Sequence, residues 1–277
     1  MPASAAYVTF TDPDKIDDEK GIAVAAWADQ GITGHIVRWD DPEVDWAAFD
    51  AVVVRTAWDY VTRRAEFLDW ARHVESVTRL LNPAAVLERN TDKVYLKDLK
   101  APIIPTFWVA PGEAADLPHL DEYVVKPSIS AGARDTIRTT DRALAEEHAA
   151  KLAANGRTAM IQPYLDMVEG EGETSLLYFG GRFSHAVRRS PMLTENATRP
   201  GQGDGHGELR TPDPDQFALA EQVLGEFPEL LYARVDLVRL ADGSPALIEI
   251  ELAEPYLFLC YAPDAAANLA TALAKAI

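Results

Sequence analysis

Short apolar runs alternate with amphipathic stretches along the first 90 residues of the chain. Such alternation of strand and helix patterns is typical of an α/β fold. We predict strands at 6–10, 36–39 and 51–54, and helices at 19–30 and 67–76. The run 51–54 is apolar at every position, as expected of a strand that is buried on both faces.

A polar and aromatic loop, Arg55-Thr56-Ala57-Trp58-Asp59-Tyr60, follows this buried strand. In open α/β sheets, ligands bind beyond the carboxyl ends of the strands. We therefore expect the loop to hold a small amino acid. Arg55 would pair with its carboxylate and Asp59 with its ammonium group.

The remaining pattern divides at Asn82-Pro83 and at a proline-containing linker, Pro102 to Pro105. Further strands are predicted at 106–109, 123–125, 159–162, 175–179, 183–187, 231–240 and 246–252. Further helices are predicted at 92–100, 141–154, 215–226 and 264–277. We therefore expect three lobes, formed by residues 1–90, 91–165 and 166–277.

Charge and cysteine content narrow the class of protein. The 277 residues carry a formal net charge of −18, which disfavours binding to nucleic acid or to anionic membranes. No signal-peptide pattern begins the chain and no apolar stretch approaches the ~18 residues of a membrane span, so we expect a cytoplasmic protein. The single cysteine, Cys260, lies in an apolar run and is expected to be buried.

The strongest chemical signal is a predicted hairpin around Asp242-Gly243. If its loop has an even number of residues, Asp236 lies opposite Glu249, Arg234 lies opposite Glu251, and all four share one face. Opposed carboxylates repel, and a divalent cation between them would relieve the repulsion. The alternative is a solvated polar face that Arg234 partly neutralises, and an odd-length loop would break the register.

Three further features are weaker when taken singly. Lys126 ends a strand and precedes a loop of small residues that includes Ser130, Ala131 and Gly132, which suits phosphate binding. Lys93 is predicted to begin a helix, where the helix dipole disfavours a lysine unless an anion is near. The apolar segment 160–165 offers a surface for adenine. Ordinary surface lysines and a buried strand end are the plain alternatives.

These features, in this order, resemble the ATP-grasp superfamily and its glutathione synthetase-like branch, over residues 82–255. The resemblance implies an ATP-grasp fold preceded by a Rossmann-like domain. It implies that Lys93, Lys126 and Arg189 contact the phosphates of ATP, under a mobile loop at 128–133. It assigns adenine to the backbone of Gln162, Pro163, Tyr164 and Leu165, the ribose to Glu173, and Mg²⁺ to Asp236 and Glu249. Glu251 stands where the family commonly has asparagine, so the number of Mg²⁺ ions stays open.

The implied reaction is an ADP-forming ligation of a carboxylate and an amine through an acylphosphate, with Arg189 and Arg234 as catalytic candidates. Residues 194–207 would cover the intermediate. Arg-x-x-Trp-Asp-Tyr and Glu249-x-Glu251-x-x-Glu254-Pro255 look like the subgroup of the cycloserine-forming cyclo-ligase, which closes a ring within O-ureido-D-serine. The substrate-binding candidates are Arg55, Trp58, Asp59, Tyr60, Arg199 and Glu254.

Several alternatives remain at this stage. A peptide-forming ligase would use the same residues with two substrates, and a nucleotide-binding regulatory protein would use them without turnover. A Rossmann-type oxidoreductase is disfavoured, because the glycine-rich stretch 201–207 neither follows a buried strand nor opens a clear helix. Similar proteins are often dimers, which makes a homodimer an assembly to test.

Overall fold

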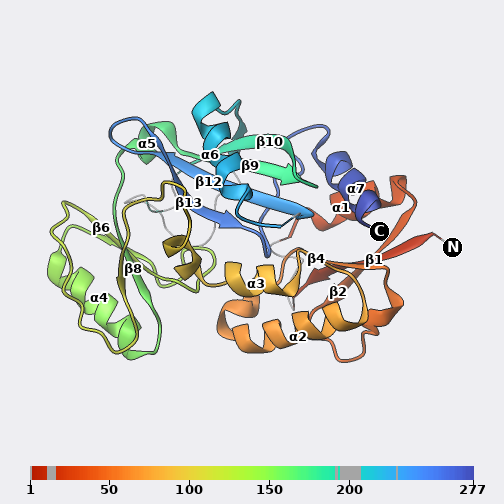
Figure 1. The fold of residues 1–277 in the computed structure, drawn as a ribbon, viewed down its shortest axis with the longest axis horizontal. Coiled ribbons are helices and arrows are strands. Elements are labelled where there is room, and N and C mark those ends of the chain that lie inside the picture. Colours follow the sequence, from red (N-terminus) through yellow and green to blue (C-terminus); the bar gives the residue numbers. More distant parts are fainter. Residues whose placement is uncertain (1, 11–16, 191–192, 194–206, 229) are drawn as a thin grey trace.

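The computed structural model describes residues 2–10, 17–190, 193, 207–228 and 230–277. Its strands form three sheets, which Figure 1 shows as separate layers. The N-terminal sheet lies towards the lower right of that view, the small sheet lies on the left, and the large C-terminal sheet crosses the middle. The division into three lobes at residues 90 and 165 stays a prediction.

The N-terminal sheet contains four parallel strands in the order β2-β1-β3-β4. Its strands are β1 (Ala3–Thr9), β2 (Ile32–Arg38), β3 (Ala51–Val54) and β4 (Leu80–Leu81). Alternate residues of β1 enter two different hydrophobic cores. Tyr7 packs in the core that contains Trp27 of α1 (Lys20–Asp29). Val8 packs in the core that contains Phe67 of α2 (Arg64–Val77). Both faces of the sheet are therefore covered, which explains the continuous apolar run of β3.

The small sheet has the order β5-β8-β6-β7, and all its pairings are antiparallel. Its strands are β5 (Phe107–Val109), β6 (Tyr123–Pro127), β7 (Ile137–Thr139) and β8 (Ala159–Pro163). Helix α4 (Arg142–Ala154) packs Ala145, Ala149 and Leu152 against the sheet. Asp141 caps this helix by accepting the backbone N–H groups of Ala143 and Leu144.

The large sheet has the order β11-β10-β9-β12-β13 and is antiparallel throughout. Its strands are β9 (Glu173–Phe179), β10 (Arg182–Arg189), β11 (Gly207–Leu209), β12 (Tyr232–Arg239) and β13 (Pro245–Glu251). Leu176 and Tyr178 face α6 (Pro214–Leu224), whereas Leu177 and Phe179 share a core with α7 (Ala265–Ala276). Because side chains alternate, Ser175 and Asp236 project from the face opposite α6.

The segment after β4 differs from the sequence prediction. The helix expected at 92–100 is wrong, because α3 runs over Ala84–Asn90 and only a short 3₁₀ helix follows at Lys93–Lys97. Pro83 precedes the first residue of α3, where a proline deprives the helix of no backbone hydrogen bond. The predicted chain break is thus a helix start.

Two further findings concern exposure and membrane insertion. The prediction that Cys260 is buried is wrong, because the thiol side chain is exposed. It follows the buried Leu257, Phe258 and Leu259 in sequence, but the apolar run turns outwards there. Among the described residues, no helix is long and apolar enough to cross a membrane.

Candidate active site

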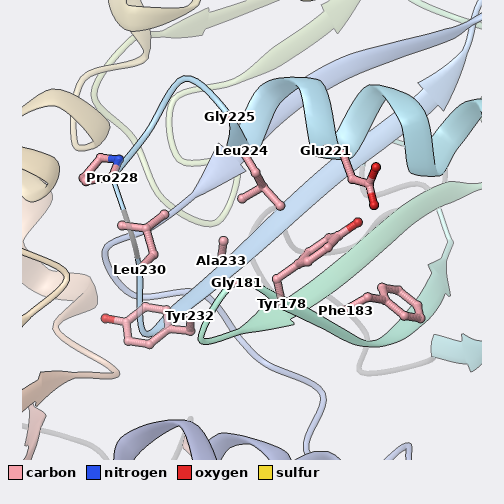
Figure 2. Close-up of a pocket in the computed structure, with 10 residues that line it drawn as sticks. All are labelled: Tyr178, Gly181, Phe183, Glu221, Leu224, Gly225, Pro228, Leu230, Tyr232 and Ala233. Atoms are coloured by element: carbon pink, nitrogen blue, oxygen red, sulfur yellow. The ribbon is translucent and has the colours of Figure 1, made fainter. Parts of the chain in front are cut away.

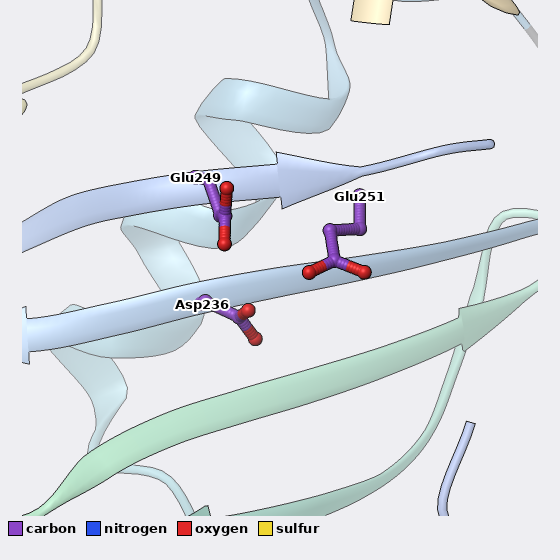
Figure 3. Close-up of side chains that lie close together, drawn as sticks. All are labelled: Asp236, Glu249 and Glu251. Atoms are coloured by element: carbon purple, nitrogen blue, oxygen red, sulfur yellow. The ribbon is translucent and has the colours of Figure 1, made fainter. Parts of the chain in front are cut away.

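The predicted carboxylate hairpin is formed by β12 and β13 (Figure 3). Asp236 lies opposite Glu249 and Arg234 lies opposite Glu251, so the predicted pairing is confirmed. The loop has an odd length, since Arg239 pairs with Pro245, but a β-bulge between Leu247 and Glu249 restores the register. Without the bulge, Glu249 would point into the core and Ile248 would take its place.

The outer edge of β13 is bonded by side chains from the preceding segment. The Tyr95 hydroxyl donates to the carbonyl of Ile250 and accepts its N–H, both at 3.0 Å. Asn90 donates to the same carbonyl at 2.7 Å and accepts the N–H of Leu252 at 2.8 Å. These contacts hold the backbone between and beyond the two glutamates of β13 and close an otherwise open sheet edge. Sequence reasoning had given Asn90 and Tyr95 no role.

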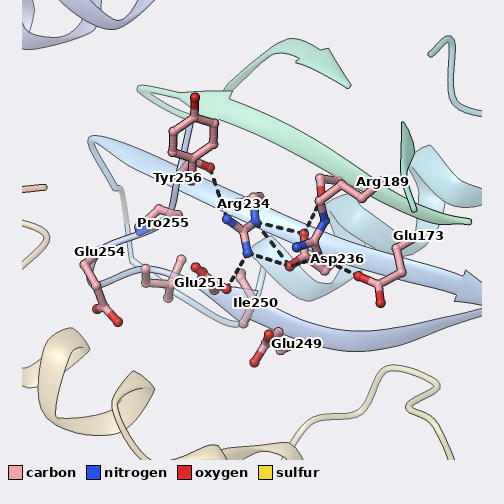
Figure 4. Close-up of polar contacts among 12 residues, drawn as sticks. Glu173, Arg189, Arg234, Asp236, Glu249, Ile250, Glu251, Glu254, Pro255 and Tyr256 are labelled. Carbon is pink, nitrogen blue, oxygen red and sulfur yellow. Dashed lines mark hydrogen bonds and ion pairs between the residues drawn. The ribbon is translucent and has the colours of Figure 1, made fainter. Parts of the chain in front are cut away.

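Asp236 is completely buried and bonded by three side chains (Figure 4). Arg189 contacts its Oδ2 at 2.9 Å, Arg234 contacts both oxygens at 2.9–3.1 Å, and the Ser175 hydroxyl donates to Oδ1 at 2.7 Å. Burial opposes ionisation of Asp236, but the two arginines outweigh it and hold its pKa below the usual value. Arg189 also donates to Glu173 at 2.6 Å. The predicted catalytic arginines and the predicted ribose ligand therefore meet beside the carboxylate hairpin.

Glu249 and Glu251, the other two carboxylates of the hairpin, form fewer ion pairs with arginine than Asp236 does. Burial raises the pKa of Glu251 to about 7; an ion pair with Arg234 opposes this shift and the nearby Glu249 adds to it. The carboxylates of Asp236, Glu249 and Glu251 each offer an oxygen, and these oxygens lie within 4.8 Å of one another. This is an oxygen-rich cluster of the kind that suits a hard divalent cation.

Two lysines lie next to this cluster. The Lys93 ammonium is 3.2 Å from Glu249 and donates to the Ser130 carbonyl at 2.9 Å. Burial lowers the pKa of Lys93, but Glu249 and Glu251 more than compensate and raise it. Burial lowers the pKa of Lys126, which has no hydrogen bond or ion pair to a described residue. Its ammonium is therefore free to take an anionic ligand.

The small-residue loop between β6 and β7 contains unusual backbone conformations. Gly132, Ala133 and Asp135 have positive φ values of 61°, 54° and 57°. Non-glycine residues adopt this region rarely, and they cluster at functional sites. Ser130 and Ala131 precede these turns, with the Ser130 carbonyl directed at Lys93.

The predicted adenine segment forms the end of β8 and the residues after it. The Gln162 side chain is buried and donates to Thr106, and the N–H of Tyr164 donates to the Glu122 carbonyl. The N–H of Leu165 has no partner among the described residues. Tyr164 and Leu165 pack around an apolar cluster that Ile248, the bulged residue of β13, also joins. The N–H of Leu165, two residues after Pro163, is thus a free donor beside an apolar cluster.

The loop after β3 departs from its predicted role at Arg55. The side chain is wholly buried and its guanidinium contacts Glu19 at 3.5 Å and the carbonyl of Pro255 at 2.7 Å. The predicted ion pair between Arg55 and a substrate carboxylate is therefore corrected to an internal one. Asp59 accepts from Trp39 at 2.9 Å and pairs with Arg63, so its carboxylate is also engaged within the protein.

Trp58 and Tyr60 point towards the C-terminal part of the site. The Trp58 indole N–H donates to the backbone carbonyl of Glu254 at 2.9 Å. Tyr60 is buried, and burial together with the nearby charge of Glu254 raises the pKa of its hydroxyl. The structure thus brings Trp58, Tyr60 and Glu254 together, whereas Arg199 and most of the predicted cover at 194–207 lie outside the described residues.

A pocket elsewhere on the large sheet contains none of the predicted site residues. It has a volume of about 410 Å³ and lies between α6 and strands β9, β10 and β12 (Figure 2). Tyr178, Glu221 and Phe183 are among its lining residues. The Tyr178 hydroxyl is buried and has no hydrogen-bond partner in the described part of the chain. Its distance along the sheet from the carboxylates makes Tyr178 a suitable control position.

Comparison with known proteins connects this geometry to one family. The family model of the D-cycloserine synthetase DcsG N-terminal domain matches residues 5–82. The cycloserine biosynthesis protein DcsG of Streptomyces lavendulae is 40% identical over 268 residues, covering 88% of this chain and 89% of that protein. The crystal structure of D-cycloserine synthetase DcsG has 38% identity and a TM-score of 0.91, and the match covers 99% of each chain.

More distant solved structures share the fold. An ATP-grasp RimK domain protein from Sphaerobacter thermophilus has 20% identity and a TM-score of 0.68, covering 99% of this chain and 98% of its own. A D-alanine–D-alanine ligase from Bacillus anthracis, solved in complex with ATP, has 13% identity and a TM-score of 0.68, covering 99% and 96%. The predicted ATP-grasp fold is therefore confirmed.

Proposed function

The chain belongs to the family of the D-cycloserine synthetase DcsG and is an ATP-grasp ligase, and on this premise we propose that it joins a carboxylate and an amine within one small amino-acid-like substrate. The observation that carries the proposal is the similarity to DcsG along 88% of the chain. Glu249, Glu251 and Glu254 lie on one segment, next to the lysines and arginines described above. This concentration of charged groups supports turnover over a purely regulatory role.

The donor set fits magnesium. Three carboxylates, of Asp236, Glu249 and Glu251, offer oxygen atoms within 4.8 Å of one another, and Mg²⁺ binds few protein carboxylates together with phosphate oxygens. Bound Mg²⁺ would neutralise charge on the phosphates of ATP. Lys93 and Lys126 would bind those phosphates directly, since both ammonium groups lie beside the hairpin.

The remaining nucleotide contacts follow from the described geometry. The free N–H of Leu165 would bond to adenine, which would lie on the apolar surface of Tyr164 and Ile248. Glu173 would accept the ribose hydroxyls, and Arg189 would contact a phosphate. The loop at Ser130, Ala131 and Gly132 would close over the phosphates and exclude water.

The proposed substrate lies between the carboxylate hairpin and the loop after β3. Trp58, Tyr60 and Glu254 would line its pocket, and Arg234 would stabilise the negative charge that develops at the reacting carbonyl. Arg199, from the predicted cover, would bind a substrate charge. Asp59, which bonds to Trp39 and Arg63, would hold the loop that carries Trp58 and Tyr60. We place the reaction in the cytoplasm, where ATP is available, and a homodimer remains the assembly to test.

The proposal is tested by measuring ADP release with ATP and Mg²⁺. We expect turnover with O-ureido-D-serine as the single organic substrate. Turnover only with pairs of amino acids would replace the cyclo-ligase with a peptide-forming ligase. Binding of ATP without ADP release from any substrate would favour a regulatory protein, and failure to bind ATP would contradict the proposal altogether.

The metal cluster is tested with Glu249→Gln. This change removes one ligand charge and the partner of Lys93, so we expect ADP release to fall by about 10²–10³-fold and the apparent affinity for Mg²⁺ to weaken. Tyr178→Phe, at the separate pocket, is the matched control and should behave like the wild type. Unchanged Mg²⁺ dependence in Glu249→Gln would remove Glu249 from the metal site.

A further inference from the structure

A carboxyl oxygen at the edge of the proposed substrate pocket has no partner. The Glu254 side chain is only 9% exposed, and its Oε2 forms no hydrogen bond to a described residue. Tyr60 is buried beside it, and the charge of Glu254 adds to burial in raising the pKa of the Tyr60 hydroxyl. Buried polar atoms in native proteins are almost always hydrogen-bonded, so an open acceptor at this place points to a ligand that donates.

The neighbours of Glu254 belong to the proposed active site. Glu254 follows Glu251 by three residues, just beyond the end of β13 (Figure 4). The charges of Glu251, Lys93 and Glu249 all act on its carboxyl group. The open oxygen is therefore within the field of the groups proposed to bind magnesium and phosphate.

The backbone that carries Glu254 is fixed from several sides. The carbonyl of Glu254 accepts from Trp58 at 2.9 Å, and the next carbonyl, that of Pro255, accepts from Arg55 at 2.7 Å. Glu19 accepts the N–H groups of Leu257 and Leu259 at 2.9 and 2.6 Å.

Glu19 and Arg55 also pair with each other, and both side chains are at most 2% exposed. This buried pair holds the chain on both sides of Tyr256, whose carbonyl accepts from Arg234 at 3.1 Å. The open oxygen of Glu254 is thus presented on an anchored segment, as a preorganised catalytic group requires.

We propose that Glu254 accepts the N–H of the attacking nitrogen and takes its proton as the carbon–nitrogen bond forms, and that Glu19 and Arg55 are positioning residues for this carboxylate. The inference rests on the proposed function. The nitrogen lone pair attacks the acyl carbon of the acylphosphate, and the carbon–oxygen bond to phosphate breaks. Inorganic phosphate leaves with that electron pair, and the nitrogen proton moves to Oε2 of Glu254.

The surroundings of Glu254 suit a proton acceptor. Burial, with Glu251 adding to it, raises the pKa of Glu254 to about 8. The ionised carboxylate therefore binds a proton more tightly than an exposed glutamate does, and because this form predominates only above about pH 8, ring formation should rise as the pH increases towards that value. Arg55 is fully buried and bonds to the Pro255 carbonyl, so its part is to position the segment that carries Glu254.

The test separates the two half-reactions. Hydroxylamine is a strong external nucleophile that traps an acylphosphate as a hydroxamate without help from a protein base. Wild type, Glu254→Gln and the control Tyr178→Phe are compared with O-ureido-D-serine, ATP and Mg²⁺. We expect Glu254→Gln to lose about 10²–10⁴-fold in ring formation while hydroxamate formation stays close to the wild-type rate.

The positioning role of Glu19 is tested by the ratio of the rate of ring formation to the rate of hydroxamate formation. Glu19→Gln should lower ring formation relative to hydroxamate, because it moves the carboxylate without removing it, whereas general destabilisation would lower both equally. Glu254→Asp, which keeps the carboxylate on a shorter side chain, should give an intermediate ratio and covers the case in which Glu254→Gln does not fold.

Three outcomes would overturn the inference. Ring formation at the wild-type rate in Glu254→Gln would show that the proton goes elsewhere. Parallel loss of ring formation and hydroxamate in folded Glu254 variants would place Glu254 before the acylphosphate. Failure of the wild type to form ADP or hydroxamate would overturn the proposed function itself, a result distinct from the first two.

Discussion

At the residue scale, the two opposed carboxylates of the hairpin, Asp236 and Glu249, pair with different kinds of cation. Asp236 is held by two arginines, whose planar groups bond to both of its oxygens. Glu249 pairs with the point charge of Lys93 instead. The arginines stabilise the ionised form of Asp236. Lys93 contacts one oxygen of Glu249, so this carboxylate can also bind other ligands. At Glu251 and Glu254, burial outweighs the neighbouring cations and raises the pKa of both carboxyl groups.

The raised pKa of Glu254 predicts how stability depends on pH. The group titrates near 4.5 in the unfolded chain and near 8 in the folded one, so between these values the folded state binds more protons. The free energy of unfolding should therefore fall as pH rises from 5 to 8, and Glu251 contributes in the same direction. Glu254→Gln removes the part that belongs to Glu254 and should show a shallower decline.

This expectation is measured by urea denaturation of both proteins at several pH values between 5 and 9. Glu88→Gln, which alters an exposed glutamate of α3, is the control and should keep the wild-type slope. An equal decline in Glu254→Gln and the wild type would contradict the assignment of the raised pKa to Glu254.

At the element scale, β13 is an edge strand that other parts of the chain complete. Asn90 and Tyr95 bond its outer edge at Ile250 and Leu252. Nearer the turn, the N–H of Leu247 donates to Pro102 and its carbonyl accepts from Ile104. The linker of prolines therefore acts as a partial partner strand, and the bulged strand keeps its register although it has no full neighbour.

The segment after β13 predicts a stability effect at Glu19. Glu19→Gln breaks a buried ion pair with Arg55 and weakens two bonds to backbone N–H groups, so we expect a loss of about 3–5 kcal/mol in the free energy of unfolding. The matched control is Glu88→Gln, which breaks an exposed pair with Arg72. Chemical denaturation at pH 7 measures both. A loss no larger than that of the control would show that Arg55 finds another partner.

At the scale of the whole molecule, Arg138 connects the small sheet to α5 (Met167–Glu171), which precedes the large sheet. It extends from β7, pairs with Glu122 at 2.7 Å and with Glu169 of α5 at 3.1 Å, and lies 3.4 Å above the Tyr164 ring. It also donates to the carbonyl of Leu193 at 2.9 Å. One side chain therefore links a sheet, the proposed adenine segment and a neighbouring helix.

Loss of this link should loosen the connection between the small sheet and α5. Each hydrogen bond to a charged group contributes about 1.5–3 kcal/mol, so Arg138→Gln should speed amide exchange over residues 164–171 by about tenfold or more. Hydrogen exchange followed by mass spectrometry measures this directly. Arg142→Gln, which changes an exposed arginine of α4, is the control. Equal exchange in both variants would show that Arg138 does not hold α5 against the small sheet.

The sequence by itself determined the features that depend on local order along the chain. Alternation of apolar and polar residues located most strands, the run 51–54 identified a buried strand, and the turn at Asp242-Gly243 located the hairpin that carries Asp236 and Glu249. The joint order of Lys93, Lys126 and the carboxylates identified the family. These inferences succeeded because backbone period and turn chemistry are set by neighbouring residues.

Only the tertiary structure decided which polar groups form bonds within the protein and are therefore unavailable to a ligand. It paired Arg55 with Glu19 across 36 residues and joined Asn90 to a strand 160 residues away. It also compensated an odd loop with a bulge at Ile248, and turned Cys260 outwards. A sequence pattern does not contain these outcomes, because burial and charge pairing depend on groups that only the folded chain brings together.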